Sequence, residues 1–389
     1  MNKNDISTIK RRLTLKKRYS ISMYSCFLRA NGEEVGRNEI SDAGSEEFEL
    51  YMSLFKKVLS GQPAQTLLNA DISNAQVLEK SPEYELLEKS AESLDNRAVR
   101  DALFDKIREA VMVEHNIATK TEDELAKDPD YLILLLHDVF DVKSKSSDDS
   151  NNEDENRSFS YILACVCPVK MGKPVLTPVN KKGGFGIREG VPYVDSPEVG
   201  FMYPAYESGY GNIGRGLIHT KKKECTHDAY QRLIFGKEEE LLSASEQTEA
   251  INTILATTLD NDCTMELIAG LNDRLAEVVN EADEEVCCDI PDVGCEDFRE
   301  VMEEFDVPEE KIKRFENEFT EKFGERARIA AVNAGRIDQF SIKLPDISII
   351  ASPESADKIS TQIIQGVKYI TIVADSDMEI NGIPVGAKV

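Results

Sequence analysis

The chain has 389 residues, enough for two or three domains, and a formal net charge of −26. Residues 238–320 hold 26 Asp or Glu against five Lys or Arg, whereas residues 1–20 hold seven Lys or Arg against one Asp. A protein this acidic repels polyanions over most of its surface, so any nucleic-acid contact depends on local basic patches. An N-terminus without the apolar core of a signal peptide, and eight cysteines without a disulfide-like spacing, predict a cytoplasmic protein with no membrane segment.

The first 115 residues predict an alternation of helices and strands. Residues 5–13 favour a short helix, and residues 18–30 alternate as a half-buried strand does, before a hairpin turn at Asn31-Gly32. An amphipathic helix follows between Phe48 and Leu59. Two further helical patterns lie near residues 82–94 and 96–115.

The clearest structural signal is a pair of apolar runs, Tyr131 to Val142 and Phe159 to Lys170. An acidic, serine-rich segment joins them, and their Val, Ile, Leu and Tyr content is typical of strands covered on both faces. They are therefore expected to be neighbouring central strands of one sheet. Residues 171–198, rich in Gly, Pro and Lys, predict an irregular connection.

The second half of the chain changes character twice. Helical stripes of apolar residues dominate residues 236–335, and a period of two returns after residue 336. The sequence thus predicts an α+β fold with a mainly antiparallel sheet, in three parts: a core domain (1–235), an acidic helical segment (236–335) and a small antiparallel β unit (336–389). Because the helices are so acidic, their apolar stripes are expected to be buried against the sheet domain or a second copy.

Several segments together resemble a known bacterial family. They are ISTIKRRLT, YLILLLHDVFDVKSK, FSYILACVCPVK, GFMYPAY, KLPDISIIASPES and DMEINGIPV. In this order they resemble the family catalogued as domain of unknown function 4317, over essentially the whole chain. One departure is Lys143, which stands where the family pattern has a proline. The resemblance implies no activity or ligand.

A second, pattern-level resemblance links Tyr131 to Val169 and Phe340 to Val385 with bacterial nucleoid-associated proteins of the YejK type. It implies DNA contact as an alternative function, although shared topology alone does not assign function. The residues available for such contact are the N-terminal basic cluster and one loop. They are Lys10, Arg11, Arg12, Lys16, Lys17 and Arg18, with Lys181, Lys182 and Arg188 in the loop.

His137-Asp138 is the most suggestive pair of catalytic residue types, because a metal-dependent hydrolase uses adjacent His and Asp ligands. Such a pair belongs on a helix, whereas Tyr131 to Val142 predicts a strand, on which neighbours face opposite sides. A structural role for His137 is therefore favoured, with burial and without a second His or Cys at ligand distance. The hydrolase remains the third alternative.

The cysteines offer three further candidate groups. The first is Cys165 with Cys167, and the second is Cys287, Cys288 and Cys295 with Cys263. The third is Cys225-Thr226-His227, in which Cys225 is a possible nucleophile and His227 its base. Cys165 and Cys167 are expected to be small apolar core residues. Acidic neighbours disfavour zinc at the second group, and sequence neighbours rarely have the geometry of a nucleophile and its base. No metal or cofactor is predicted.

Scattered pairs of reactive residues do not make an active site. The sequence therefore favours a non-enzymatic binding or scaffolding protein, with another protein or a second copy as partner. A nucleoid-associated, DNA-contacting role is the first alternative.

Overall fold

The computed structural model describes residues 1, 3–142, 157–178, 184–207, 209–237, 241–284, 290–335, 337, 339–374, 378–380 and 383–385. The chain has an α+β fold and divides into two compact units, Met1–Ser243 and Ala244–Val389. The three-part division of the sequence stays a prediction. Among the described helices, none is long and apolar enough to cross a membrane.

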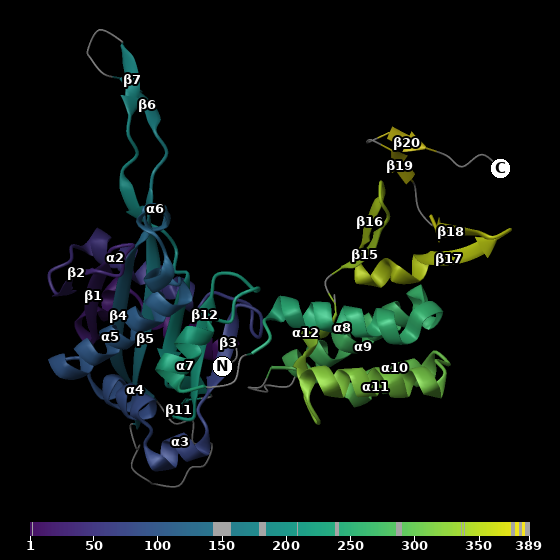
Figure 1. Ribbon diagram of the computed structural model, residues 1–389, viewed down its shortest axis with the longest axis horizontal. Helices are drawn as coiled ribbons and strands as arrows, with labels where there is room; N and C mark the ends of the chain where they lie inside the picture. The colour runs from purple at the N-terminus through teal and green to yellow at the C-terminus, as the bar shows by residue number, and fades with distance from the viewer. Residues whose placement is uncertain are drawn as a thin grey trace, which may run out of the picture. The chain divides into compact units, whose positions relative to one another are not determined.

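The first unit is built on an eight-stranded antiparallel sheet (Figure 1). The strand order is β2-β1-β4-β5-β9-β12-β3, and β8 pairs with β5. The strands are β1 (Ile21–Leu28), β2 (Glu34–Glu39), β3 (Leu67–Asp71), β4 (Asp130–Val142), β5 (Arg157–Met171), β8 (Pro192–Val194), β9 (Val199–Tyr203) and β12 (Arg215–Thr220). A small hairpin, β10 (Ala205–Glu207) with β11 (Tyr210–Asn212), follows β9.

Helices cover both faces of this sheet. On one face lie α1 (Lys3–Arg12), the 3-10 helix η1 (Leu15–Ser20) and α2 (Ser45–Val58); on the other lie α4 (Pro82–Glu92), α5 (Arg97–Glu114) and α7 (Asp228–Phe235). Shorter elements are α3 (Asn74–Glu79), η2 (Ile117–Thr119) and α6 (Glu122–Leu125). Gly216 lets α7 approach β12 closely, because a Cβ there would lie 2.3 Å from the Phe235 ring.

The two apolar runs pair with each other, as the sequence predicts. β4 and β5 are antiparallel neighbours in continuous register, with Leu134 opposite Cys165 and Leu136 opposite Leu163. Both strands contribute side chains to the core on each face, which explains their nearly uninterrupted apolar character.

The expectation of an irregular connection at residues 171–198 is wrong in part. Two strands, β6 (Val175–Pro178) and β7 (Phe185–Arg188), form an antiparallel ribbon that continues beyond the β5–β8 pair. Figure 1 shows it projecting from one end of the sheet. The Gly and Pro residues that suggested a loop lie mainly between the strands rather than within them.

The second unit contains four long helices. They are α8 (Ala244–Leu259), α9 (Met265–Glu284), α10 (Cys295–Glu304) and α11 (Glu309–Phe323), joined by η3 (Asp260–Asp262), β13 (Asp292–Val293), β14 (Ile329–Ala330) and α12 (Ala331–Ala334). Their apolar stripes pack on one another, with Phe298, Phe315 and Phe319 within about 6 Å of each other between ring centroids. The stripes thus form a core of their own, which differs from the expected burial against the sheet domain or a second copy.

The C-terminal strands form separate hairpins. They are β15 (Phe340–Lys343) with β16 (Ser348–Ala351), β17 (Ile359–Ile364) with β18 (Val367–Ile372), and β19 (Met378–Ile380) with β20 (Ile383–Val385); the 3-10 helix η4 (Pro353–Lys358) separates the first two. In the described residues, the antiparallel strands expected from the sequence form three two-stranded pieces. Strand period alone predicts such strands but not every pairing among them.

Phe315→Ala tests whether the helical core has this arrangement. The substitution removes a fully buried ring between Phe298 and Phe319, which should lower the free energy of unfolding of this unit by about 3–5 kcal/mol. Hydrogen exchange of residues 244–335, measured by mass spectrometry, should accelerate accordingly. Asn317→Ala, on the exposed face of the same helix, serves as control and should change stability by less than about 0.5 kcal/mol. Equal exchange in the two variants would contradict the packing.

Candidate functional site

His137 and Asp138 point to opposite faces of β4. The His137 imidazole is buried on the α4 side, where Nε2 lies 2.9 Å from the Ser160 hydroxyl and 3.1 Å from the Ala91 carbonyl oxygen. Asp138 is buried on the α1 side. Because the strand separates the two side chains, the structure does not bring them together as a catalytic or metal-binding pair.

Asp138 instead anchors the first helix to the sheet. The Arg12 guanidinium donates two hydrogen bonds of 2.9 Å to its carboxylate, and the Tyr161 hydroxyl donates a third of 3.2 Å. The Arg12 guanidinium also lies 4.8 Å from the centroid of the Phe140 ring. Burial and the Asp138 charge raise the pKa of Tyr161 well above its usual value, so the hydroxyl stays protonated and donates. The role of this group is structural.

Two members of the N-terminal basic cluster are engaged in contacts within the fold. Arg12 is bound to Asp138, and Arg18 donates to the Ser41 carbonyl oxygen and lies over the Phe48 ring. The other four residues, Lys10, Arg11, Lys16 and Lys17, form no ion pair with any carboxylate that the structure describes. In the predicted loop, Lys181 and Lys182 lie outside the described residues, and Arg188 lies on β7.

The six described cysteines do not assemble into a reactive group. Cys165 and Cys167 are fully buried with their sulfur atoms 3.9 Å apart, and burial raises the pKa of Cys165 well above its usual value. Cys263 and Cys295 are half-buried thiols whose pKa values burial also raises, whereas Cys287 and Cys288 lie outside the described residues. Within the described ranges, no group of three or more His, Cys, Asp or Glu is placed to hold a metal ion.

Three of the four histidines gather near the end of the sheet from which the ribbon projects. His115 ends α5, with Nε2 3.6 Å from the Glu198 carboxylate, and its ring lies 5.0 Å from that of Tyr131. His227 precedes α7, with Nδ1 3.1 Å from the Glu114 carboxylate. His219 lies on β12, close enough to feel the charge of His227. We call these three residues, with Glu114 and Glu198, the histidine cluster.

The His227–Glu114 pair is the most ordered part of the histidine cluster. His227 adopts the left-handed conformation with φ 54°, and its backbone carbonyl accepts the first hydrogen bonds of α7. Burial raises the pKa of Glu114, but the hydrogen bond from His227 and the charges of His227 and His115 outweigh burial, so this pKa lies below its usual value. An imidazole oriented by a carboxylate has the geometry of a general base.

The neighbouring thiol does not complete a catalytic arrangement. Burial raises the pKa of Cys225, and the nearby carboxylates of Glu114, Glu198 and Glu224 raise it further, against the effect of Lys222. A thiol with a raised pKa is a poor nucleophile at neutral pH. The Cys225 and His227 pair noted in the sequence is therefore not an activated nucleophile with its base.

A charged group ties the base of the ribbon to the sheet. The Asp195 carboxylate accepts hydrogen bonds from Lys170 at 2.6 Å and from Lys221 at 3.0 Å. These bonds, with a further one from the Ser196 backbone, hold the pKa of Asp195 well below its usual value. Asp195 thus joins β5 and the residue that follows β12, next to the histidine cluster.

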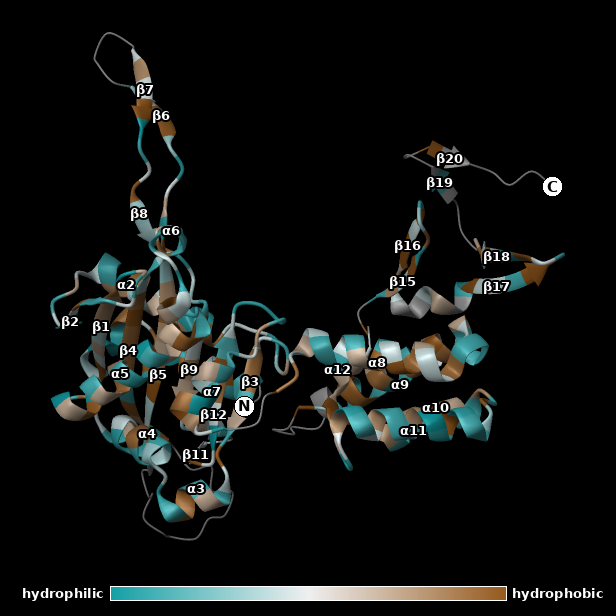
Figure 2. Ribbon diagram, in the orientation of Figure 1, coloured by the Kyte–Doolittle hydropathy of each residue, from teal (hydrophilic) through white to brown (hydrophobic). Residues whose placement is uncertain are grey.

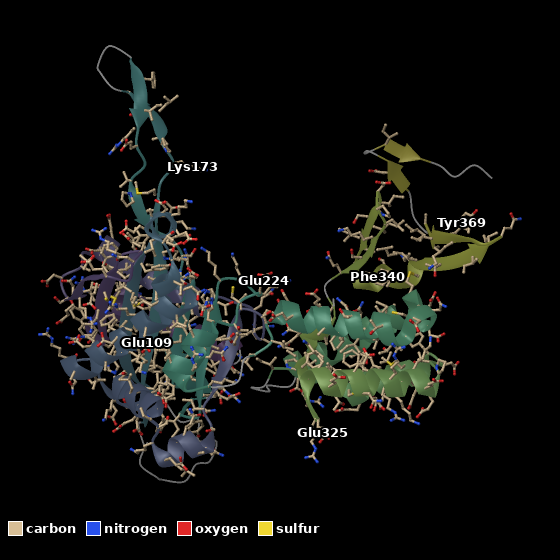
Figure 3. The ribbon with its side chains drawn as sticks, viewed as in Figure 1. Glu109, Lys173, Glu224, Glu325, Phe340 and Tyr369 are labelled. Carbon is tan, nitrogen blue, oxygen red and sulfur yellow. The ribbon has the colours of Figure 1, made fainter. Side chains whose placement is uncertain are left out.

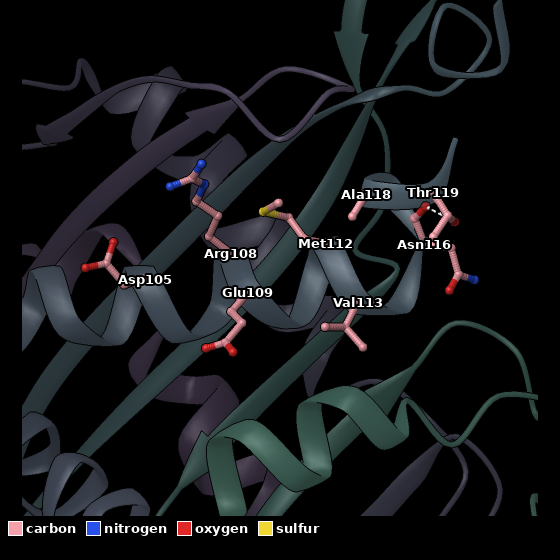
Figure 4. Close-up of a pocket in the computed structure, with 8 residues that line it drawn as sticks. All are labelled: Asp105, Arg108, Glu109, Met112, Val113, Asn116, Ala118 and Thr119. Atoms are coloured by element: carbon pink, nitrogen blue, oxygen red, sulfur yellow. Dashed lines mark hydrogen bonds between the residues drawn. The ribbon is translucent and has the colours of Figure 1, made fainter. Parts of the chain in front are cut away.

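An open groove of 520 Å³ runs along the exposed side of α5 (Figure 4). It is lined by Asp105, Arg108, Glu109, Met112, Val113, Asn116, Ala118 and Thr119. The Arg108 Nε donates to the Gly32 carbonyl oxygen, which fixes one end of the groove. Its size suits a small molecule, but its side chains present no convergent set of polar groups.

The sequence alone does not reveal the carboxylates that contact these histidines and lysines. Glu114, Glu198 and Asp195 are acidic residues among 72, and nothing local marks them as the residues that meet a histidine or two lysines. The ribbon did have a local signal, since Leu176 and Pro178, and then Phe185 and Ile187, repeat with a period of two around Gly183-Gly184.

Comparison with known proteins identifies the family. The model of a family described as a domain of unknown function, DUF4317, matches residues 1–383, so the chain belongs to this family, as its sequence motifs suggested. Neither the curated proteins nor the solved structures contained a match.

His219 provides a test of the buried histidine cluster. Its Nδ1 is buried without a hydrogen-bond partner among the described residues, and burial, with the charge of His227, lowers the pKa of His219 to about 4. Unfolding then takes up a proton below pH 6.5, so stability from this group is present above pH 6.5 and is lost as pH falls towards 4. Between pH 7 and 4.5 the unfolding free energy of His219→Leu should fall by about 2–3 kcal/mol less than that of the wild type. An identical pH dependence of the unfolding free energy in urea titrations of the two proteins would contradict this contribution from His219.

Proposed function

We propose that this chain is a non-enzymatic binding or scaffolding protein whose β6–β7 ribbon engages another polypeptide. The observation that carries the proposal is a continuous apolar surface on the ribbon that faces solvent. Contiguous apolar side chains on a projecting hairpin favour association with a partner, because an apolar surface that no partner covers promotes aggregation.

The ribbon register defines this surface. Leu176 pairs with Ile187 and Pro178 with Phe185, so these four side chains share one side, which we call the apolar ribbon face. Leu176 is 72 % exposed, Ile187 77 % and Phe185 69 %. Figure 2 shows the hydrophobic colouring of both strands, and Figure 3 shows side chains spreading outward from the ribbon above Lys173.

The histidine cluster lacks an activated thiol nucleophile among the described residues, which favours the non-enzymatic interpretation. His227 and Glu114 satisfy each other, and the nearest thiol has a raised pKa. The hydrolase alternative has no support from His137 and Asp138, since each is committed to its own face of the sheet.

Cytoplasmic location is part of the proposal. The six described cysteines are all free thiols, and Cys165 and Cys167 remain unpaired although they are strand neighbours. Free thiols at this density are typical of a reducing compartment.

The proposal predicts the effect of one charge on the ribbon. Leu176→Glu places a carboxylate in the apolar ribbon face and should weaken partner binding more than tenfold, because a buried leucine contributes about 1.5–3 kcal/mol. The measurement is in-cell crosslinking from a photoreactive residue at position 185, with the crosslinked polypeptide identified and quantified by mass spectrometry.

Thr177→Glu is the matched control, because it adds the same charge on the opposite side of the same strand and should keep the crosslink. Equal yields from the two variants, or no polypeptide crosslinked in a defined stoichiometry, would remove the ribbon as a binding surface.

A second candidate function is weak nucleic-acid binding by the N-terminal basic cluster. Lys16 and Lys17 are exposed without a described carboxylate partner, and the Tyr19 side chain between them and β1 is fully exposed. Unpaired basic side chains beside an exposed aromatic ring match the combination of backbone attraction and base stacking that single strands require.

The nucleic-acid candidate predicts salt-sensitive binding of a single-stranded oligonucleotide. Fluorescence anisotropy should detect binding at 50 mM salt and little at 200 mM, because salt cations compete with the lysines for the phosphates. The net charge of −26 keeps the affinity low at both salt concentrations. Replacing Lys16 and Lys17 by Ala should reduce the slope of log affinity against log salt by about 1.4. The exposed pair Lys222 and Lys223 is the control for charge alone. No binding at 50 mM salt would eliminate this candidate.

A further inference from the structure

We propose that the apolar ribbon face is a self-association surface, which packs against the same face of a second copy of this chain. The inference rests on the proposed binding role of the ribbon and names the partner. The result is an isologous contact, in which Leu176, Phe185 and Ile187 of one copy meet the same residues of the other.

The ribbon is a continuation of the sheet. β5 and β8 pair up to Met171 and Pro192, and the Gly172 backbone N–H then donates to the Val191 carbonyl oxygen at 3.1 Å. At Gly190 the two strands approach so closely that a Cβ would lie 1.7 Å from the Gly172 oxygen. Backbone hydrogen bonds thus lead from the buried sheet to the ribbon, and this limits the conformational freedom lost when a partner binds.

A two-stranded ribbon cannot bury its own apolar side chains. One side of β6–β7 holds Leu176, Pro178, Phe185 and Ile187, and the other holds Val175, Thr177, Gly186 and Arg188. Isolated hairpins are at best marginally stable in water, whereas a second layer with a hydrophobic face supplies the missing core. An identical ribbon fits this requirement, because the apolar ribbon face contains no charge that the contact would bury unpaired.

Charge favours the ribbon as the place where two copies meet. The chain carries −26, and residues 244–389 alone hold 32 Asp or Glu against 13 Lys or Arg, so two copies repel each other over most of their surfaces. Residues 171–194 differ, with four Lys or Arg and one Glu. A ribbon contact therefore keeps the acidic surfaces out of the interface, and salt screens the smaller repulsion between the two basic ribbons.

Salt dependence separates this proposal from nucleic-acid binding by the same ribbon. Contact between apolar faces of like-charged copies should strengthen as salt screens the repulsion. A polyanion held by Lys173 and Arg188 should instead be released by salt. The uniformly apolar side chains of the ribbon face favour the second copy over the polyanion.

The test uses the purified full-length protein in sedimentation velocity from 1 to 100 µM at 50 and 500 mM NaCl. The wild type should form a dimer at the upper concentrations, and more of it at 500 mM NaCl. Leu176→Glu and Ile187→Glu should each raise the dimer dissociation constant at least tenfold, whereas Thr177→Glu should retain dimerisation. Far-UV circular dichroism identical to that of the wild type establishes that each variant is folded.

Crosslinking locates the interface independently. With benzoylphenylalanine at position 185, a mixture of isotopically light and heavy protein should give mixed-isotope crosslinks to peptides that contain residues 176 or 187. A dimer that persists unchanged in both Glu variants, or a wild type that is monomeric at 100 µM and 500 mM NaCl, overturns the proposal. If that monomer still crosslinks a different polypeptide through position 185 in cells, the second copy is the wrong partner while the proposed binding function stands. An oligonucleotide that blocks crosslinking from position 185 at low salt, in a protein that does not dimerise, also overturns the proposal of a second copy.

Discussion

Burial of the β4–β5 pair on both of its faces is the constraint on which the N-terminal unit depends. Leu134, Leu136 and Cys165 enter one core, while Leu135 and Ile162 enter the other. A shift of one residue in β4 would exchange the side chains that it contributes to the two cores and turn the Asp138 carboxylate away from Arg12. The single register therefore fixes the positions of α1 and α2 on one face and of α4, α5 and α7 on the other.

The same alternation shows what the sequence can predict and what it cannot. Period and composition are local properties, so the two central strands, the α+β class and the opposite orientations of His137 and Asp138 followed directly from the sequence. The partners of these residues did not, because Arg12 is 126 residues from Asp138 and Ala91 is 46 residues from His137. Pairing across such distances depends on the packing of α1 and α4, for which one sequence holds no local signal.

The ribbon illustrates a different limit. Its strands are four residues long and lie among Pro174, Pro178 and Gly190, all of which are also typical of loops. Period two is present, but a strand that joins no core lacks the long apolar run that made β4 and β5 easy to predict. The histidine cluster could not be predicted for another reason. Its residues lie mostly at or near the ends of helices and strands, and the spacing of such residues along the chain does not show which of them are close in space.

The helical unit explains how so acidic a chain retains its fold. One arginine commonly serves several carboxylates: Arg328 is paired with Asp292, Glu296 and Asp297, and Arg299 with Glu303, Glu309 and Glu316. These pairs are largely exposed and each contributes little, so the stability of this unit rests on its aromatic core. The uncompensated carboxylates also act between molecules, where they keep copies apart. Under that repulsion, apolar side chains support a specific contact only outside the acidic surfaces, as on the β6–β7 ribbon, where residues 171–194 hold four Lys or Arg against one Glu.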